Sequence, residues 1–419
     1  MPAGSGLSAT LGIATETTPG VPVVVTRFKE FNSETMQMKK KEAQGSGLRG
    51  GGLVRRAQRR NYVSRAAAGN LDFNVPTNGF GLWLQHMLGS FSTTPVSLGG
   101  GLFQQVHNTG TLQGKAFTMQ VLKPDTTGVL AQNAFTYPGC KVTGWDLSVA
   151  AGQPVILKLN VDALDEATPQ NAFAPTTLAA ASIAGAVSIS TVATIPIGSY
   201  ITIGIGLTAE VVLTTNVSGA GPFTVTVPAL TYAHATSSYV GSATQANYGA
   251  AATLQAASYT VGAQIWDFSQ GSLVAGGVTS VVSGVWTVTG GTTVANVRSV
   301  SLKGTNALHV ARDQMGSQLR NEQLENGYRD YTCAVTVEYN SRLLYDVYAA
   351  DAALAVVLKF TNRAGSVLQF FCPASFQEDG ASPSVAGPDI LVQSLMFTIL
   401  DDGVNGALQA VYTSTDATV

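Results

Sequence analysis

The sequence predicts a mainly β protein, an antiparallel β-sandwich or barrel flanked by one short α-helix and carrying a small inserted all-β domain. Three observations lead to this class. Only 11% of the 419 residues are charged while 45% are hydrophobic and 45 are glycine, which is typical of short strands joined by tight turns. Alternation with a period of two recurs in both halves of the chain. One short stretch alone has helical spacing.

That stretch is "NLDFNVPTNGFGLWLQHMLGS", residues 70–90. It begins as an alternating strand up to Val75 and then changes to apolar residues at helical spacing. Thr77 and Asn78 are expected to cap the helix, and Gly89 is expected to end it. The residues expected to anchor the helix in the core are Phe80, Trp83, Met87 and Leu88.

Two strand patterns frame the rest of the main domain. "GWDLSVAAGQPVILKLNVD" reads as a hairpin with its turn near Gly152. "YTCAVTVEYN", residues 331–340, places every second residue from Tyr331 to Tyr339 on one face. Strands from both ends of the chain are therefore expected to join in one sandwich or barrel.

The middle of the chain is almost uncharged. Between Glu166 and Asp267 the only charged side chain is Glu210, and short β-patterned runs such as "PFTVTV" alternate with turns. A flexible linker is the alternative, but linkers lack such apolar runs. We therefore expect residues 171–256 to be an inserted β-domain, on the outer surface, between residues 1–170 and 257–419 of the main domain.

The sequence also contains a basic run. Residues 27–65 hold 11 of the 23 lysines and arginines against three glutamates. Repulsion between like charges and the entropy of the glycines favour a loop or arm, residues 39–65, that orders only against a partner surface. Direct nucleic-acid binding is the less favoured interpretation, because Tyr62 is the only aromatic residue in the core of the run.

No arrangement of residues typical of catalysis is present, so we expect no enzyme activity, no metal site and no cofactor. The four histidines have no metal-ligand spacing, and His86 is expected to lie on the short helix and to pack beside its apolar neighbours. The three cysteines are far apart and are expected to be buried thiols. Asp401 and Asp402, in "DDGVNG", are expected to form a turn.

No secretion signal opens the sequence, and no apolar run reaches the ~18 residues that a membrane span needs. We therefore expect a soluble protein made in a cytoplasm.

Several phrases together resemble phage tail tube (major tail) proteins of long-tailed, siphovirus-like phages. They are the opening "GLSATLGIATETTPGVPVVVTRFKEFNSETM", then "GSGLRGGG", then "AAGNLDFNVPTNGFGLWLQHMLGS", and near the end "RNEQLENGYRDYTCAVTVEYN", "LLYD" and "VAGPDILVQSLMFTIL". The resemblance rests on their order and combination, and it excludes the inserted domain. The basic run is longer and richer in arginine than the family pattern.

The resemblance implies a structural virion protein that self-assembles into hexameric rings, which stack into a tube for DNA delivery into the host. Its implied partners are itself, the tail tip or baseplate, the tape measure and the tail terminator proteins, with phage DNA passing transiently through the lumen. A lumen that conducts DNA must not hold it, so the arginines are expected in contacts between subunits or rings. They are Arg49, Arg55, Arg56, Arg59, Arg60 and Arg65, and their expected partners are Glu322, Glu325, Asp401 or Asp402.

Two alternatives stay open at this point. One is a virion-surface or baseplate adhesin whose inserted domain binds host carbohydrate, and the other is a β-rich hydrolase. Within the tube interpretation, the inserted domain either presents loops for weak adhesion or braces adjacent rings.

Overall fold

The structure is a computed structural model that describes residues 5–47, 54–90, 94–124, 133–169, 173–205, 208–243, 248–260, 263–378, 382–383, 385 and 387–418. The described chain is mainly β, as the sequence predicts, and every pairing between its named strands is antiparallel. It contains α1 (Gly81–Leu88) and a second α-helix, α2 (Leu343–Ala349), which the sequence analysis did not predict. Short 3-10 helices are η1 (Gly6–Ser8), η2 (Ala57–Arg59), η5 (Gly249–Ala252) and η6 (Phe268–Gln270).

The main body consists of two parts, which we call unit 1 (residues 10–163) and unit 2 (residues 271–414). The strands of unit 1 are β1 (Thr10–Thr15), β2 (Arg27–Lys29), β3 (Ser33–Glu34), β4 (Gln37–Gln44), β5 (Arg60–Asn74), β6 (Val96–Gly99), β7 (Leu102–Asn108), β8 (Phe117–Leu122), β9 (Ala134–Ala150) and β10 (Ile156–Ala163). Those of unit 2 are β18 (Gly271–Ala275), β19 (Val278–Val282), β20 (Val285–Thr289), β21 (Thr292–Thr293), β22 (Val297–Thr305), β23 (Leu308–His309), β24 (Leu324–Glu325), β25 (Asp330–Glu338), β26 (Leu354–Thr361), β27 (Val367–Gln377), β28 (Val392–Leu400) and β29 (Gln409–Ser414).

The two units repeat one order of strand pairs. Unit 1 pairs β2–β1–β8–β9–β10–β5–β4. Unit 2 pairs β21–β18–β26–β27–β28–β25–β22. The helix follows the same strand in both, because α1 comes after β5 and α2 after β25. The main body is therefore an internal duplication of one fold, and not a single domain interrupted by an insert.

The registers of the two units also correspond. Asn74, at the end of β5, faces Ile156 at the start of β10, and Glu338, at the end of β25, faces Val392 at the start of β28. The longest strand of each unit contains a proline, Pro138 in β9 and Pro373 in β27, where its pairing with β8 or β26 shifts register. Proline cannot donate to a ladder and is tolerated at such irregularities. After the proline, β9 pairs with β10 in unit 1, and β27 pairs with β28 in unit 2.

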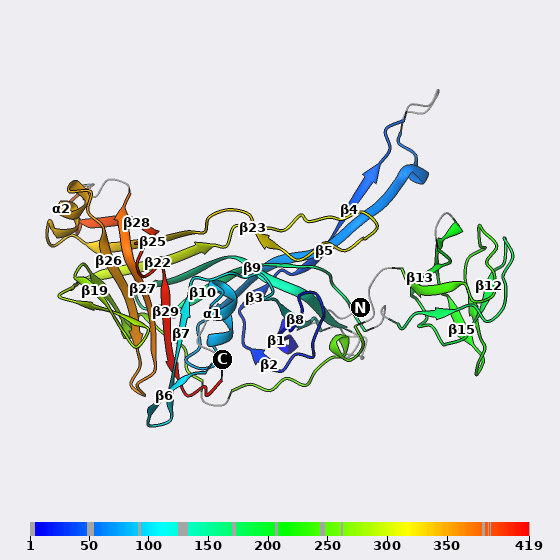
Figure 1. Cartoon of the computed structure of the whole chain (residues 1–419), viewed down its shortest axis with the longest axis horizontal. Coiled ribbons are helices and arrows are strands. Elements are labelled where there is room, and N and C mark those ends of the chain that lie inside the picture. The colour runs from blue at the N-terminus through cyan, green and yellow to red at the C-terminus, as the bar shows by residue number, and fades with distance from the viewer. Residues whose placement is uncertain are drawn as a thin grey trace.

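The two units are joined through their sheets. β9 of unit 1 pairs with β22 of unit 2 from Ser299 opposite Ala150 to Thr305 opposite Gly144. β29 closes the other side, between β27 of unit 2 and β7 of unit 1. One hydrophobic cluster runs through both units, from Leu11 and Trp83 to Phe397 and Tyr412. Figure 1 shows the units side by side, with β29 between them.

Residues 173–243 form a small module with its own sheets and its own hydrophobic cluster. Its strands are β11 (Thr176–Thr177), β12 (Ser188–Thr191), β13 (Tyr200–Ile203), β14 (Glu210–Leu213), β15 (Asn216–Ser218), β16 (Phe223–Thr226) and β17 (Tyr239–Ser242). Glu210 is the one charged residue in this part of the sequence. Its carboxylate accepts a hydrogen bond from the Thr231 amide (2.7 Å), and its Oε1 lies 2.8 Å from His234 Nε2. In Figure 1 the module lies apart from the main body at one end of the molecule.

Neither helix in the described part of the chain has the length and apolar character needed to cross a membrane.

Candidate assembly interface

The helix α1 belongs to the core. Phe80, Trp83, Met87 and Leu88 are all 0% exposed. The Trp83 ring lies 5.4 Å from Phe73 and 5.6 Å from Phe117, measured between centroids. These residues fix the helix against the sheet of unit 1, so they shape the subunit from inside.

The expectation that Thr77 and Asn78 cap the helix is wrong. Phe80 is the residue before the helix, and no side chain caps it. The Thr77 hydroxyl instead accepts a hydrogen bond from the Gln264 amide (3.1 Å), and Asn78 donates to the Thr415 hydroxyl (2.6 Å). Both therefore connect segments distant in sequence. Gly89 does end the helix, in the left-handed conformation that glycine adopts without strain.

His86 is buried in the same region, and it packs 4.7 Å from the Phe117 ring. Burial, with help from Lys141 and Lys115, lowers the pKa of His86 to about 3. The imidazole is therefore neutral near pH 7 and is unsuited to general acid–base chemistry there.

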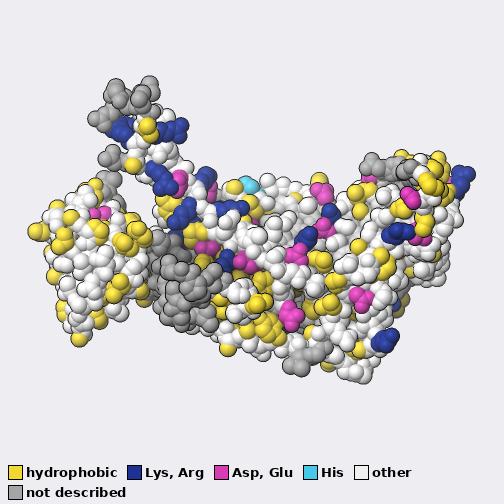
Figure 2. All heavy atoms as spheres, turned by 180° about the vertical axis from the view of Figure 1, so that it is seen from behind, with side chains coloured by type: hydrophobic (Ala, Val, Ile, Leu, Met, Phe, Trp, Pro, Cys, Tyr) yellow, Lys and Arg dark blue, Asp and Glu magenta, His cyan; other side chains and the backbone are white. Residues whose placement is uncertain are grey.

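We call residues 37–65 arm 1, and its described parts, residues 37–47 and 54–65, contain a pair of strands. β4 pairs with β5 from Gln37 opposite Ala68 to Gln44 opposite Arg60. Most side chains of β4 are exposed. Figure 1 shows the arm standing away from the main body, and Figure 2 shows its cluster of Lys and Arg side chains from behind. Part of the expected arm is thus an ordered strand pair.

The arginines of arm 1 have different surroundings. Arg60 pairs with Glu42 across the hairpin, and Arg55, Arg56 and Arg59 form no ion pair with any residue that the structure describes. Arg55 and Arg59 are exposed and Arg56 is half-buried. Arg49 lies outside the described residues.

Arg65 is occupied within the chain. Its guanidinium binds both carboxylate oxygens of Asp165, at 2.6 and 3.0 Å, and both side chains are buried. Tyr248 also donates to Asp165, at 2.8 Å. This buried pair fastens the base of arm 1 to the segments on either side of the module, so Arg65 does not face another subunit.

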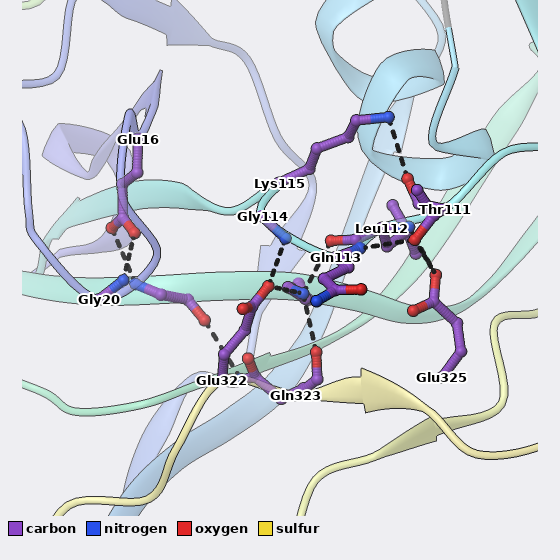
Figure 3. A network of polar contacts seen from close by, with 12 residues as sticks. Glu16, Gly20, Thr111, Leu112, Gln113, Gly114, Lys115, Glu322, Gln323 and Glu325 are labelled. Carbon is purple, nitrogen blue, oxygen red and sulfur yellow. Dashed lines mark hydrogen bonds and ion pairs between the residues drawn. The ribbon is translucent and has the colours of Figure 1, made fainter.

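A second hairpin, arm 2 (residues 306–329), lies across unit 1. The Glu322 carboxylate accepts hydrogen bonds from the Gly114 amide and from Lys141 Nζ, both at 2.6 Å. Lys141 is fully buried and also donates to the carbonyls of Leu112 (2.8 Å) and Gln323 (2.7 Å). Burial lowers the pKa of Lys141, and Glu322 opposes that effect. Figure 3 shows Glu322 directed at this loop of unit 1.

Glu325 makes a second anchor on the same loop. It accepts a hydrogen bond from the Leu112 amide (2.5 Å) and pairs with Arg329 (3.1 Å). Burial alone would raise its pKa, but these donors outweigh burial and hold the pKa of Glu325 below its usual value. Arg329 in turn donates to the Leu88 carbonyl (2.8 Å) at the end of α1.

A third anchor joins arm 2 to β10. Arg320 lies 3.0 Å from both carboxylate oxygens of Asp162, and Gln323 Nε2 donates to Asp162 at 2.8 Å. Burial raises the pKa of Asp162, and Arg320 and Gln323 counteract it. Arm 2 is therefore held by three separate buried or half-buried polar anchors.

These contacts revise the expected partners of the arginines. Glu322 and Glu325 are engaged by unit 1 and Arg329, so they are not available to arm 1. Asp401 and Asp402 form a turn, in which Asp402 accepts hydrogen bonds from the amides of Val404 (2.9 Å) and Asn405 (2.6 Å). Both remain exposed.

The sequence did not lead us to the residues that anchor arm 2 on unit 1 within the chain, which are Lys141, Asp162, Arg320 and Gln323. A signal was present in the dense polar run "RNEQLENGYR" directly before the strand at residues 330–338. Its partners, however, lie far away in the sequence.

The described residues contain no group of three or more His, Cys, Asp or Glu that could hold a metal ion. Cys140, Cys333 and Cys372 are free and buried, and burial raises the pKa of each thiol. The buried or half-buried ion pairs Arg65–Asp165, Lys141–Glu322 and Arg320–Asp162 hold the strands and the arms together.

One family model, described as phage tail tube protein, matches residues 6–227 and 193–399. The first segment contains unit 1 and the second contains nearly all of unit 2, and they overlap within the module. A search of curated proteins gave no significant match.

Proposed function

Because the chain belongs to the phage tail tube protein family, a structural component of the virion tail, we propose that its copies assemble into stacked rings that form the tail tube. The tube is the conduit through which DNA passes into the host cell. The sequence resemblance implies six-membered rings of tail tube subunits.

The observation that carries this proposal is the sheet that crosses from unit 1 to unit 2. Backbone hydrogen bonds between β9 and β22 join two copies of the same fold into one sheet. The same kind of head-to-tail contact, repeated with a rotation that closes, generates a ring. In the same sheet β4 pairs, among the described strands, only with β5. The outer edge of β4 is therefore unpaired and can pair with a strand of another chain.

The charge of the arm fits the proposal. Arginines lining a DNA conduit would bind phosphates, and each neutralised phosphate strengthens that binding. Arg55, Arg56 and Arg59 have no partner carboxylate among the described residues of their own chain. We place these residues in contacts between subunits, away from the DNA.

The other partners follow from the tube. The ends of the tube meet the tail tip or baseplate and the tail terminator, and the tape measure protein occupies the lumen until DNA enters. Assembly takes place in the host cytoplasm. The module, residues 171–256 in the sequence-based division, faces outward.

Electron microscopy of the concentrated protein at moderate salt tests the proposal. Wild type is compared with Arg55→Ser/Arg56→Ser/Arg59→Ser/Arg60→Ser and with a control, Lys359→Ser/Arg363→Ser, in the β26–β27 hairpin. Hollow tubes from wild type and control, with only single rings or monomers from the arm variant, support both the tube and the role of the arm. Tubes from all three keep the tube and contradict that role. Closed trimers without a lumen contradict the tube.

A further inference from the structure

We propose that arm 1 of each chain docks on unit 2 of a second copy of this chain, in the way that arm 2 docks on unit 1 within the chain. This inference rests on the proposed function. If a ring holds six tail tube folds and each chain supplies two, the ring contains three chains.

The two arms are equivalent elements. Arm 1 continues the strand pair β4–β5, and arm 2 continues the corresponding pair β22–β25. The last paired residues enclose segments of similar length in the two arms, since Gln44 faces Arg60 and His309 faces Leu324. The residues that anchor arm 2 lie on its returning half, and the returning half of arm 1 carries Arg55, Arg56, Arg59 and Arg60.

Arm 2 covers a surface of unit 1, and the corresponding surface of unit 2 is less covered by the described residues. The strand register places Phe376 opposite Thr398, as it places Lys141 opposite Asp162 in unit 1. Lys141 and Asp162 are buried beneath arm 2, whereas Phe376 and Thr398 are half-buried. On the same strand as Thr398, Met396 is 41% and Leu400 48% exposed, so two large apolar side chains are left uncovered in the single chain.

The loop that receives Glu322 also has a counterpart. Gly114 lies three residues before β8, and Asp351 lies three residues before β26, in the loop after α2. Both residues have positive φ, 74° and 48°. Unit 1 offers a backbone amide and Lys141 to the carboxylate of Glu322. At the corresponding place unit 2 has the carboxylate of Asp351.

The charges of the proposed partners are complementary. Arm 1 contains nine Lys and Arg against one Glu, and residues 330–402 contain nine Asp and Glu against three Lys and Arg. Asp351, Asp401 and Asp402 are exposed. Opposite potentials steer two surfaces together, and they do so less effectively at high salt.

The reversed signs also separate the two docking sites. Lys141 receives the acidic side chain of Glu322 and would repel the arginines of arm 1. Asp162, the carboxylate of unit 1 that could receive an arginine, is already engaged by Arg320 of arm 2. Arm 1 is thus directed to unit 2 of another chain.

Cross-linking tests this contact. Because all three native cysteines are buried, a short bis-maleimide reagent reacts chiefly with cysteines placed at Arg56→Cys and Asp351→Cys in one chain. The control pair is Arg56→Cys with Arg363→Cys, which keeps the arm cysteine and moves its partner to an exposed turn. Circular dichroism and thermal unfolding establish that both variants fold as the wild type does.

We expect covalent multimers that end at three chains for the first pair and at most traces for the control. Multimers that continue to six chains overturn the count of three chains per ring. Tubes in the microscope without cross-links overturn the docking and leave the tube intact. Protein that forms neither tubes nor cross-links overturns the docking and the proposed function together.

Charge exchange gives an independent test. Arg55→Asp/Arg56→Asp/Arg59→Asp is expected to reduce the assembled fraction at least tenfold, and adding Asp351→Arg/Asp401→Arg to it is expected to restore assembly. Undiminished assembly of the arm variant overturns the docking, as does failure of the exchanged chain to assemble any better than the arm variant.

Discussion

At the scale of single residues, Trp83 links the helix to two strands of unit 1. Its side chain is 0% exposed, and its ring contacts Phe73 on β5 and Phe117 on β8. The sequence predicts this position well, because helical spacing alone marks the buried face of a short helix. The packing partners come from strands whose pairing the spacing does not define.

We predict that Trp83→Ala lowers the free energy of unfolding by about 3–5 kcal/mol, since it leaves a cavity that rigid strands cannot fill. Denaturant unfolding of dilute protein measures the change. Tyr328→Ala, at a side chain 96% exposed, serves as the control and is expected to change stability by less than ~0.5 kcal/mol. Equal effects of the two substitutions would contradict the core role of Trp83.

His86 makes the stability depend on pH. Its pKa is about 3 in the folded chain because of burial, and about 6.5 in an unfolded chain. As pH falls below about 6.5, the unfolded state takes up a proton that the native state does not, which costs ~1.4 kcal/mol of stability per pH unit until about pH 3.

Replacing His86 by Leu removes this dependence. Between pH 6.5 and 5 we expect wild type to lose about 2 kcal/mol more stability than His86→Leu. Denaturant unfolding of both proteins at the two pH values tests the difference. His107 is also buried, which lowers its pKa to about 3, and it contributes equally in both proteins. Parallel losses would show that His86 is not a buried neutral group.

At the scale of elements, the two arms differ in what holds them. Arm 2 is anchored on unit 1 through Lys141, Asp162 and the loop at Gly114. The described part of arm 1 is held at its base by Arg65 and Asp165, and Lys41 on β4 pairs with Asp313 of arm 2 at 2.6 Å. Arm 1 can be recognised in the sequence from its charge. Arm 2 cannot, because its charges balance and the residues of unit 1 that anchor it lie more than a hundred residues away.

Glu322→Gln tests the anchoring of arm 2. The change leaves the buried ammonium of Lys141 without a carboxylate, and we expect a loss of about 1–3 kcal/mol in the free energy of unfolding. Faster protease cleavage within arm 2 should accompany it.

The matched control is Glu338→Gln, which breaks the half-exposed pair with Arg298 and is expected to cost less than ~1 kcal/mol. If Glu322→Gln were as mild as the control and arm 2 as resistant to protease as in wild type, the Lys141 anchor would not hold the arm.

The duplication was hidden from the sequence for a physical reason. Alternation along a strand records which face is buried, and the hairpin at residues 145–161 and the strand at 331–339 are both predicted from it. It does not record which strand lies next to which. Equivalent positions hold unlike residues, such as Asp162 and Thr398, or Lys141 and Phe376, because one site is covered by an arm and the other is open.

At the scale of the whole molecule, the module lies between the two units in sequence and is separate from their core. Its hydrophobic cluster shares no residue with that of the main body. The chain leaves and re-enters unit 1 at nearly one place, since Tyr248 hydrogen-bonds to Asp165. The module can therefore be removed without stretching the chain on either side.

We predict that a chain with residues 170–247 replaced by a short Gly-Ser linker keeps its thermal stability and still forms tubes, of smaller outer diameter. Electron microscopy and thermal unfolding of both chains test this. A shortened chain that folds normally but forms only single rings would show that the module braces adjacent rings.

The central claim is that this chain builds a hollow tube from two tail tube folds per subunit. Cryo-electron microscopy of the assembled protein tests it most directly. The account predicts stacked rings around an open lumen, with six folds in each ring supplied by three chains and a continuous inner sheet that includes β9 and β22. Particles without a lumen, or rings in which β9 and β22 of one chain are apart, would contradict it.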